Sequence, residues 1–430
     1  MNSKVLIRGG CVLTLGAKTP NFAEADVLIE ESRVVEVAPG IRARDAEVVD
    51  ATDTIVMPGF VDTHRHVWKS LFRNFGDGGD EAGGPGNWGH HYQPEDVYAA
   101  TLIGLLGAVE AGITTVVDWS DIQFDERYTD ATLQAHADAG LRTVFVHTAA
   151  QGSSRDGELK AALSRLKSNS SMTVAYGSSD PLTPEAVAVN WGLARQLGLR
   201  IHTHSGQRPG LVSALAGLLG ADVTLIHCSN LDESDLNAVS SRGVSVSLTP
   251  SSEMASGSGR PPIQKLLDRN IRPGLGIDNE QIAPGDMFAQ MRTAISLQHA
   301  SYFELKLAGK AGLPNLLTTR DVIRYATVDG ARVAGLGALT GSIEPGKQAD
   351  LVILRADRPN IAPINDAIGA VVWGMDTSNV DWVFVAGKPL MRSGVLVADV
   401  KAASEAAVRA QRQVAGAAGL MAAAGSGVSK

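Results

Sequence analysis

The sequence predicts an α/β protein built on a (β/α)8 TIM barrel, with a small β-sandwich domain attached. Three observations indicate this fold. Short β-branched segments alternate with longer helical stretches between residues 57 and 340, eight such segments are present, and no glycine-rich phosphate fingerprint follows the first of them. Alternating strands and helices indicate a parallel sheet, and eight strands over this length favour a closed barrel. An open doubly wound sheet, the structural alternative, usually carries that fingerprint.

Each expected barrel strand is a run rich in β-branched or other apolar residues. The eight runs are Gly59–His66, Thr114–Trp119, Arg142–Ala149, Met172–Asp180, Leu199–Ser205, Asp222–Ser229, Val244–Ser252 and Arg272–Asp278. In TIM-barrel enzymes the active site is built at the C-terminal ends of the strands. Polar residues at the ends of these runs are therefore the candidates for function.

The two ends of the chain differ from the middle. Residues 1–56 and 341–398 alternate in the β manner and lack long helical stretches. We expect them to combine into one small β-sandwich domain beside a barrel of residues 57–340. Residues 399–430 begin with an alanine-rich stretch, which predicts a C-terminal helix followed by a tail.

Net charge, cysteine content and hydrophobicity limit the kinds of partner and the compartment expected for the chain. The chain has 430 residues and a formal net charge of −8, which argues against binding to a nucleic-acid backbone. Only two cysteines occur, Cys11 and Cys228, so a disulfide framework is not expected and a reducing cytoplasm fits best. No run of 18 apolar residues is free of charge, which argues against a membrane partner. We expect a cytoplasmic protein that acts on a small molecule.

Histidines gather at the expected strand ends. His64 and His66 are two residues apart on a strand, so their side chains point to the same face and can bind one divalent metal. His204, His227 and Asp278 end three further strands. This placement predicts a metal site at the C-terminal end of the barrel. His202 is expected to be a core histidine.

These motifs resemble the amidohydrolase superfamily. The segment VMPGFVDTHRH at residues 56–66, the single histidines on strands five and six, the aspartate on strand eight, and the segment GSIEPGKQADLVIL at residues 341–354 carry the resemblance, which covers the whole chain. The branch it is most similar to contains triazine hydrolases, adenosylhomocysteine deaminases and guanine deaminases.

The resemblance implies a ligand set and a reaction. His64, His66, His204 and Asp278 match the metal ligands, and His227 matches the histidine that contacts substrate and the attacking water. One divalent metal is implied, zinc first and iron second, because no lysine ends the fourth strand. Asp278 would take the proton of the metal-bound water and pass it to the leaving group. Relatives are often dimers or larger, so a homo-oligomer is expected.

One residue departs from this branch of the family. A glutamate usually lies three residues after the strand-five histidine, and this chain has Gln207, which cannot transfer a proton. Glu253 and Glu280 follow other strand ends and are candidate substitutes; the alternative is that both are solvated loop carboxylates. Trp68 follows the metal pair and is a candidate for the substrate pocket, with packing of the first βα loop as the alternative.

The leading hypothesis is hydrolytic deamination of a nitrogen heterocycle. Hydrolysis of an amide, urea, carbamate or carbon–chlorine bond is the enzymatic alternative, and Gln207 makes it more credible. A non-catalytic scaffold of the same fold is the alternative from another class. It is disfavoured because such proteins tend to lose metal ligands, whereas this chain retains the full set.

Overall fold

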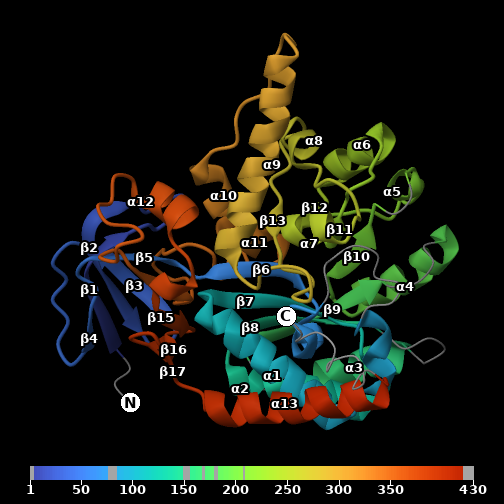
Figure 1. Ribbon diagram of the computed structural model, residues 1–430, viewed down its shortest axis with the longest axis horizontal. Helices are drawn as coiled ribbons and strands as arrows, with labels where there is room; N and C mark the ends of the chain where they lie inside the picture. The colour runs from blue at the N-terminus through green and yellow to red at the C-terminus, as the bar shows by residue number, and fades with distance from the viewer. Residues whose placement is uncertain are drawn as a thin grey trace, which may run out of the picture.

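The computed structural model describes residues 4–75, 85–148, 155–166, 170–178, 183–206 and 209–419. Eight parallel strands form its central sheet in the order of the chain (Figure 1). They are β6 (Phe60–Arg65), β7 (Ile113–Ser120), β8 (Arg142–His147), β9 (Met172–Ser178), β10 (Ile201–Ser205), β11 (Val223–His227), β12 (Ser245–Leu248) and β13 (Gly274–Leu275). The eight strands expected from the sequence are all present.

Backbone hydrogen bonds close the sheet between its first strand and the segment after its last one. The amide of Asp278 donates to the carbonyl of His64 at 2.8 Å, and the amide of His66 donates to the carbonyl of Asp278 at 3.0 Å. An isolated parallel bridge joins Arg65 to Asp278 at the same place. The predicted TIM barrel is therefore confirmed, and its closure lies at the expected metal ligands.

Helices surround the barrel strands (Figure 1). They are α1 (Pro94–Glu110), α2 (Glu126–Ala139), α3 (Arg155–Leu166), α4 (Pro184–Gln196), α5 (Leu211–Ala214), α6 (Glu233–Arg242), α7 (Pro250–Ala255), α8 (Ile263–Leu267), α9 (Met287–Leu307), α10 (Thr319–Tyr325) and α11 (Val328–Val333). Aspartates cap several N-termini; Asp286, for example, accepts a hydrogen bond from the backbone of α9. The far end of α9 projects beyond the barrel.

The seventh barrel strand is shorter than the sequence predicted. It ends at Leu248, and helix α7 begins at Pro250. Proline at the first helical position loses no hydrogen bond, because that amide has no partner within the helix. Glu253 is consequently a helix residue and not a loop residue.

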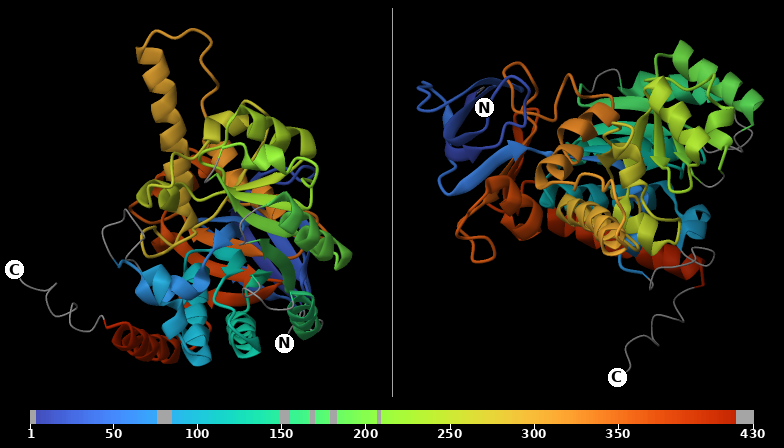
Figure 2. Two further views of the ribbon diagram at one scale, coloured as in Figure 1. Left: turned by 90° about the vertical axis from the view of Figure 1, so that its right-hand side faces the viewer. Right: turned by 90° about the horizontal axis from the view of Figure 1, so that it is seen from above.

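The two ends of the chain meet in one mixed sheet beside the barrel (Figure 2). Its nine strands are β1 (Lys4–Val12), β2 (Phe22–Glu30), β3 (Arg33–Ala38), β4 (Glu47–Asp50), β5 (Thr54–Pro58), β14 (Leu351–Arg355), β15 (Val380–Val385), β16 (Lys388–Arg392) and β17 (Val395–Leu396). β5 and β14 are antiparallel neighbours, which joins the N-terminal strands to the C-terminal ones. The residue limits chosen for this domain stay a prediction.

Helix α13 (Val400–Ala417) runs along α1 at the edge of the barrel (Figure 1). Its Val414 and Ala415 pack into a buried cluster with Phe72 and Tyr92, close to the first barrel loop. Among the described residues, no helix is long and apolar enough to cross a membrane. Cys11 and Cys228 are both free thiols, so the two cysteines do not form a disulfide.

Candidate active site

His64 and His66 reach one point because they lie two residues apart at the end of β6. Residue 64 is fully buried and residue 66 is 7% exposed. β6 is buried along its whole length, because it belongs to a parallel sheet that helices cover. The two imidazoles are therefore held in the interior at the barrel's C-terminal end, as the sequence predicted.

His204 and Asp278 complete a compact set of donors with this pair. Nε2 of His64 lies 3.2 Å from Nε2 of His204. Oδ1 of Asp278 lies 3.4 Å from Nε2 of His64, and the same distance from Nε2 of His66. Ligands that stand about 2.0–2.1 Å from zinc at tetrahedral angles are separated from each other by roughly 3.3–3.4 Å, and these three distances fit that spacing. Within 4.8 Å of one another, the donor atoms form two groups that share His64: one with His66 and Asp278, the other with His204 and His227. His64, His66 and Asp278 could therefore share one metal ion, with His204 beside His64.

The protonation states expected for these residues also suit the binding of a metal cation. Burial lowers the pKa of His64 to about 4, although Asp278 acts in the opposite direction. Burial likewise holds the pKa of His204 well below its ordinary value. Burial alone would raise the pKa of Asp278, but the hydrogen bond and the charges of the neighbouring histidines hold it well below its usual range. Neutral imidazoles beside an ionised carboxylate offer the lone pairs and the negative charge that a divalent metal binds.

Further side chains contact the ligand candidates on the side away from the metal position and orient them. Asp121, at the end of β7, has Oδ1 at 3.3 Å from Nδ1 of His66 and accepts a 2.5 Å hydrogen bond from Nε1 of Trp68. Ser252 donates a 2.5 Å hydrogen bond to Oδ2 of Asp278. A carboxylate behind a ligating histidine is the usual arrangement at metal sites. Sequence reasoning gave Asp121 and Ser252 no role as ligand supports.

Trp68 itself is packed and does not line the cavity at the site. Its side chain is 5% exposed, and its ring meets that of Tyr92 edge to face at 5.3 Å. This placement favours the packing alternative over substrate contact. Trp68 influences the site through Asp121.

The backbone is strained where the site is built. His227, Cys228 and Asp278 have φ values of 70°, 62° and 65°, in the left-handed region that side chains other than glycine rarely adopt. Such residues cost of order 1–3 kcal/mol each and persist where the surroundings hold them in place. Because none of them is glycine, the sequence carries no signal for this conformation.

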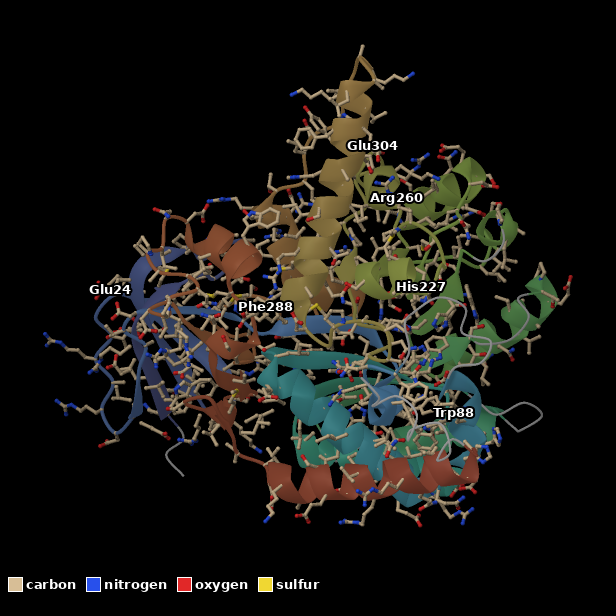
Figure 3. All side chains as sticks on the ribbon, viewed as in Figure 1. Glu24, Trp88, His227, Arg260, Phe288 and Glu304 are labelled. Carbon is tan, nitrogen blue, oxygen red and sulfur yellow. The ribbon has the colours of Figure 1, made fainter. Side chains whose placement is uncertain are left out.

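A cavity of about 560 Å³ opens over the metal-ligand candidates. His66, His204 and Asp278 lie in its wall, together with His227. Figure 3 shows His227 among the side chains at the ends of the barrel strands. The remaining lining is polar and includes Lys69, Ser229, Asn230, Ser256 and Ser258.

The two candidate carboxylates are placed differently, and neither is a solvated loop residue. Glu253 is 1% exposed, and its Oε1 lies 3.2 Å from Nδ1 of His227, so it reaches the site. Glu280 is 8% exposed and forms an ion pair with Arg65, N to O 2.8 Å, and another with Arg73 at 3.0 Å. The Glu280 carboxylate is not among the groups that line the cavity, so its contacts favour a structural role.

Gln207 and His202 are the two remaining sequence candidates. Gln207 lies outside the described residues. His202 is fully buried, and burial lowers its pKa to about 3, so it is a neutral core histidine as expected.

A TIM barrel with three imidazoles and one carboxylate at its C-terminal end defines a metal-dependent hydrolase of the amidohydrolase type. The amidohydrolase family model matches residues 55–390 of this chain. The chain belongs to the amidohydrolase family.

Two curated relatives are similar along nearly their whole length. A 5'-deoxyadenosine deaminase of Methanothermobacter thermautotrophicus is 30% identical over 429 residues, which covers 92% of this chain and 95% of that protein. A 5-methylthioadenosine/S-adenosylhomocysteine deaminase of Symbiobacterium thermophilum is 28% identical and covers 90% and 93%.

Solved structures share the fold. An adenosine deaminase from Xanthomonas campestris with bound zinc superposes with a TM-score of 0.81 at 22% identity, covering 95% of this chain and 98% of that one. An atrazine chlorohydrolase variant from Arthrobacter aurescens, complexed with zinc and atraton, gives a TM-score of 0.82 at 19% identity, covering 95% and 100%. The fold prediction and the recognised family are both confirmed.

Proposed function

We propose that this protein is a one-metal deaminase that hydrolyses the exocyclic amine of adenosine-type nucleosides, with zinc as its metal. The observation that carries the proposal is the grouping of His64 with His66 and Asp278, and of His204 with His64, at a polar cavity. The two curated relatives described above are deaminases of adenosine derivatives, and the zinc-containing structures support the choice of metal.

Each residue has a role that its contacts support. The metal, when bound, lowers the pKa of a water molecule toward about 7. Asp278 keeps one oxygen beside His64 and His66 and the other on Ser252, so it can take the water's proton and deliver it to the departing amine. His227 lines the cavity beside His204, where a neutral ring nitrogen can orient the attacking oxygen.

Dechlorination, or hydrolysis of an amide, urea or carbamate, is the second candidate. Its support is the shared fold with atrazine chlorohydrolase and the presence of Gln207 in place of a proton-transferring glutamate. The same metal centre serves either leaving group, since both reactions begin with attack of hydroxide on an sp2 carbon.

The test combines metal analysis with product release. The purified protein would be loaded with zinc and given 5'-deoxyadenosine, 5-methylthioadenosine, S-adenosylhomocysteine and atrazine, while ammonia and chloride are measured. We expect one zinc per chain and ammonia from at least one nucleoside. Asp278→Asn should release none, because the proton acceptor is lost. One bound zinc without ammonia from any nucleoside would overturn the deaminase proposal, and chloride from atrazine would establish the second candidate.

A further inference from the structure

One buried carboxylate oxygen joins helix α7 to the cavity. Oε1 of Glu253 accepts a 2.9 Å hydrogen bond from the backbone amide of Thr249 and a 3.3 Å hydrogen bond from its hydroxyl. The same oxygen lies 3.2 Å from Nδ1 of His227, and the Thr249 hydroxyl oxygen lies 3.0 Å from that nitrogen. Glu253 is therefore in contact with both the start of the helix and a cavity-lining imidazole.

These contacts assign the proton on the His227 ring. Oε1 already accepts the backbone amide hydrogen of Thr249 and faces Nδ1 as an acceptor, so Nδ1 is the nitrogen that carries hydrogen. The Thr249 hydroxyl fits the same pattern, because its own hydrogen is directed to Glu253 and its oxygen can accept from Nδ1. Nε2 is then the ring nitrogen without hydrogen. Without the carboxylate, a neutral imidazole would exchange between two tautomers, and one of them would present N–H to the water.

The backbone that carries the His227 ring is strained, and neighbouring residues hold it in place. His227 adopts a φ of 70°, and the next residue, Cys228, one of 62°. Gly206 packs against that backbone so closely that a Cβ there would lie 2.7 Å from the amide nitrogen of Ser229. Backbone strain that neighbouring contacts maintain is common at active sites, where it fixes the direction of a side chain.

We propose that Glu253 is the positioning residue of His227: it fixes the proton on Nδ1 and the ring plane, so that Nε2 accepts a hydrogen bond from the attacking water. Asp278 still takes the water's proton, and no net proton passes through His227. The inference rests on the proposed function, because the oriented water is that of the deaminase reaction. Its effect falls on the rate of attack and not on substrate binding.

The competing explanation is that Glu253 only caps α7. A matched control exists at α10, where Asp321 accepts a 2.9 Å hydrogen bond from the backbone amide of Thr318, the residue before that helix. If capping were the whole role, Glu253→Ala and Asp321→Ala would behave alike. Both changes remove the acceptor of an amide hydrogen bond at the start of a helix, and only Glu253→Ala also removes the acceptor beside Nδ1 of His227.

The experiment measures kcat, KM, zinc content and thermal stability for Glu253→Ala, Asp321→Ala, His227→Asn and the double variant Glu253→Ala/His227→Asn. Loss of a carboxylate behind an active-site histidine commonly lowers activity about 10- to 100-fold. We expect a fall of this size in kcat for Glu253→Ala, with KM and zinc content unchanged, and no fall for Asp321→Ala. The double variant should be no slower than His227→Asn alone, because Glu253 acts through that ring.

Two results would overturn the inference. Wild-type kcat in Glu253→Ala would leave only the capping role, and multiplied losses in the double variant would show that Glu253 acts independently of His227.

A readout that needs no turnover separates this inference from the proposed function. The zinc protein should show a downfield imidazole N–H proton resonance that His227→Asn and Glu253→Ala both remove. If the resonance is present but the wild type is inactive on every nucleoside, the proposed substrate class is wrong and the positioning role of Glu253 stands. If the resonance is absent, the positioning role is wrong.

Discussion

The guanidinium of Arg65 and the carboxylate of Glu280 form an ion pair, N to O 2.8 Å, beneath the metal-ligand candidates. Arg65 lies between His64 and His66 in the chain and is fully buried, while Glu280 follows Asp278 by two residues. The pair therefore joins the two strand ends that supply three of the four ligands. A buried charge pair of this kind is costly to break, because Arg65 would keep only its longer contact with Asp62, N to O 3.5 Å, in the interior.

Glu280→Gln should lower stability at neutral pH and change how stability depends on pH. The charges of Arg65 and Arg73 lower the pKa of Glu280 to about 2, against the effect of burial. A depressed pKa stabilises the fold fully above about pH 4.5, and this contribution is lost as the pH falls toward 2. We expect a loss on the order of 3 kcal/mol at pH 7.

Denaturant unfolding of the metal-free protein at pH 7, 5, 4 and 3 measures this effect. The difference between wild type and Glu280→Gln should shrink below about pH 4.5. Glu304→Gln is the control, since that side chain is 72% exposed and should change stability little. A difference that stays constant down to pH 3 would contradict the ion-pair explanation.

Asp121→Asn should weaken metal binding. The carboxylate lies 3.3 Å from Nδ1 of His66, and its loss would leave that ring less firmly oriented toward the metal. Zinc affinity, measured by competition with a chelator, should fall about 10- to 100-fold. Trp68→Phe removes the hydrogen bond that holds Asp121 and should give a smaller change in the same direction. Unchanged affinity in both variants would mean that Asp121 serves only to pair with Trp68.

Zinc retention should persist to a lower pH than ordinary histidines would allow. Metal and protons compete for the same nitrogen, and the pKa of His64 is lowered to about 4 by burial. Protonation of His64 should therefore compete with zinc only as the pH falls toward about 4. Zinc content after dialysis at each pH, with circular dichroism to confirm the fold, measures this. Complete loss of zinc already at pH 6 would contradict this prediction.

Local patterns explain why so much of the fold could be predicted. The strand runs are short-range features, and His64 and His66 share a face because side chains alternate along a strand. The end of β12 was predicted less well: apolar and hydroxyl residues continue past Leu248, whereas Pro250 begins a helix. That proline was the available signal for the boundary.

The supporting residues of the site could not be predicted in the same way. The role of Glu280 depends on a buried arginine, and arginine is ordinarily a surface residue. The role of Glu253 depends on the left-handed backbone at His227, which is not expected of a residue other than glycine. Both roles come from contacts between segments far apart in the chain.

For the proposed deaminase activity, Lys69 should influence which nucleosides are accepted. Its ammonium group lies 5.8 Å from the centre of the Trp68 ring, and its side chain lines the cavity beside His66. Apart from the metal-ligand candidates and His227, the lining residues are mostly serine, asparagine and glycine, so Lys69 brings a positive charge to a region of neutral polar groups. A substrate that carries a carboxylate would gain a charge-assisted hydrogen bond there, which contributes about 1.5–3 kcal/mol.

Lys69→Met should therefore raise KM at least about tenfold for S-adenosylhomocysteine, which has a carboxylate, and leave KM for 5'-deoxyadenosine, which has none, nearly unchanged. The measurement is the ratio of kcat/KM for the two nucleosides in wild type and variant, so a general loss of folded enzyme cancels. An equal loss for both substrates would show that Lys69 acts only by packing on Trp68. In that case the neutral serines and asparagine of the cavity would be left to determine selectivity.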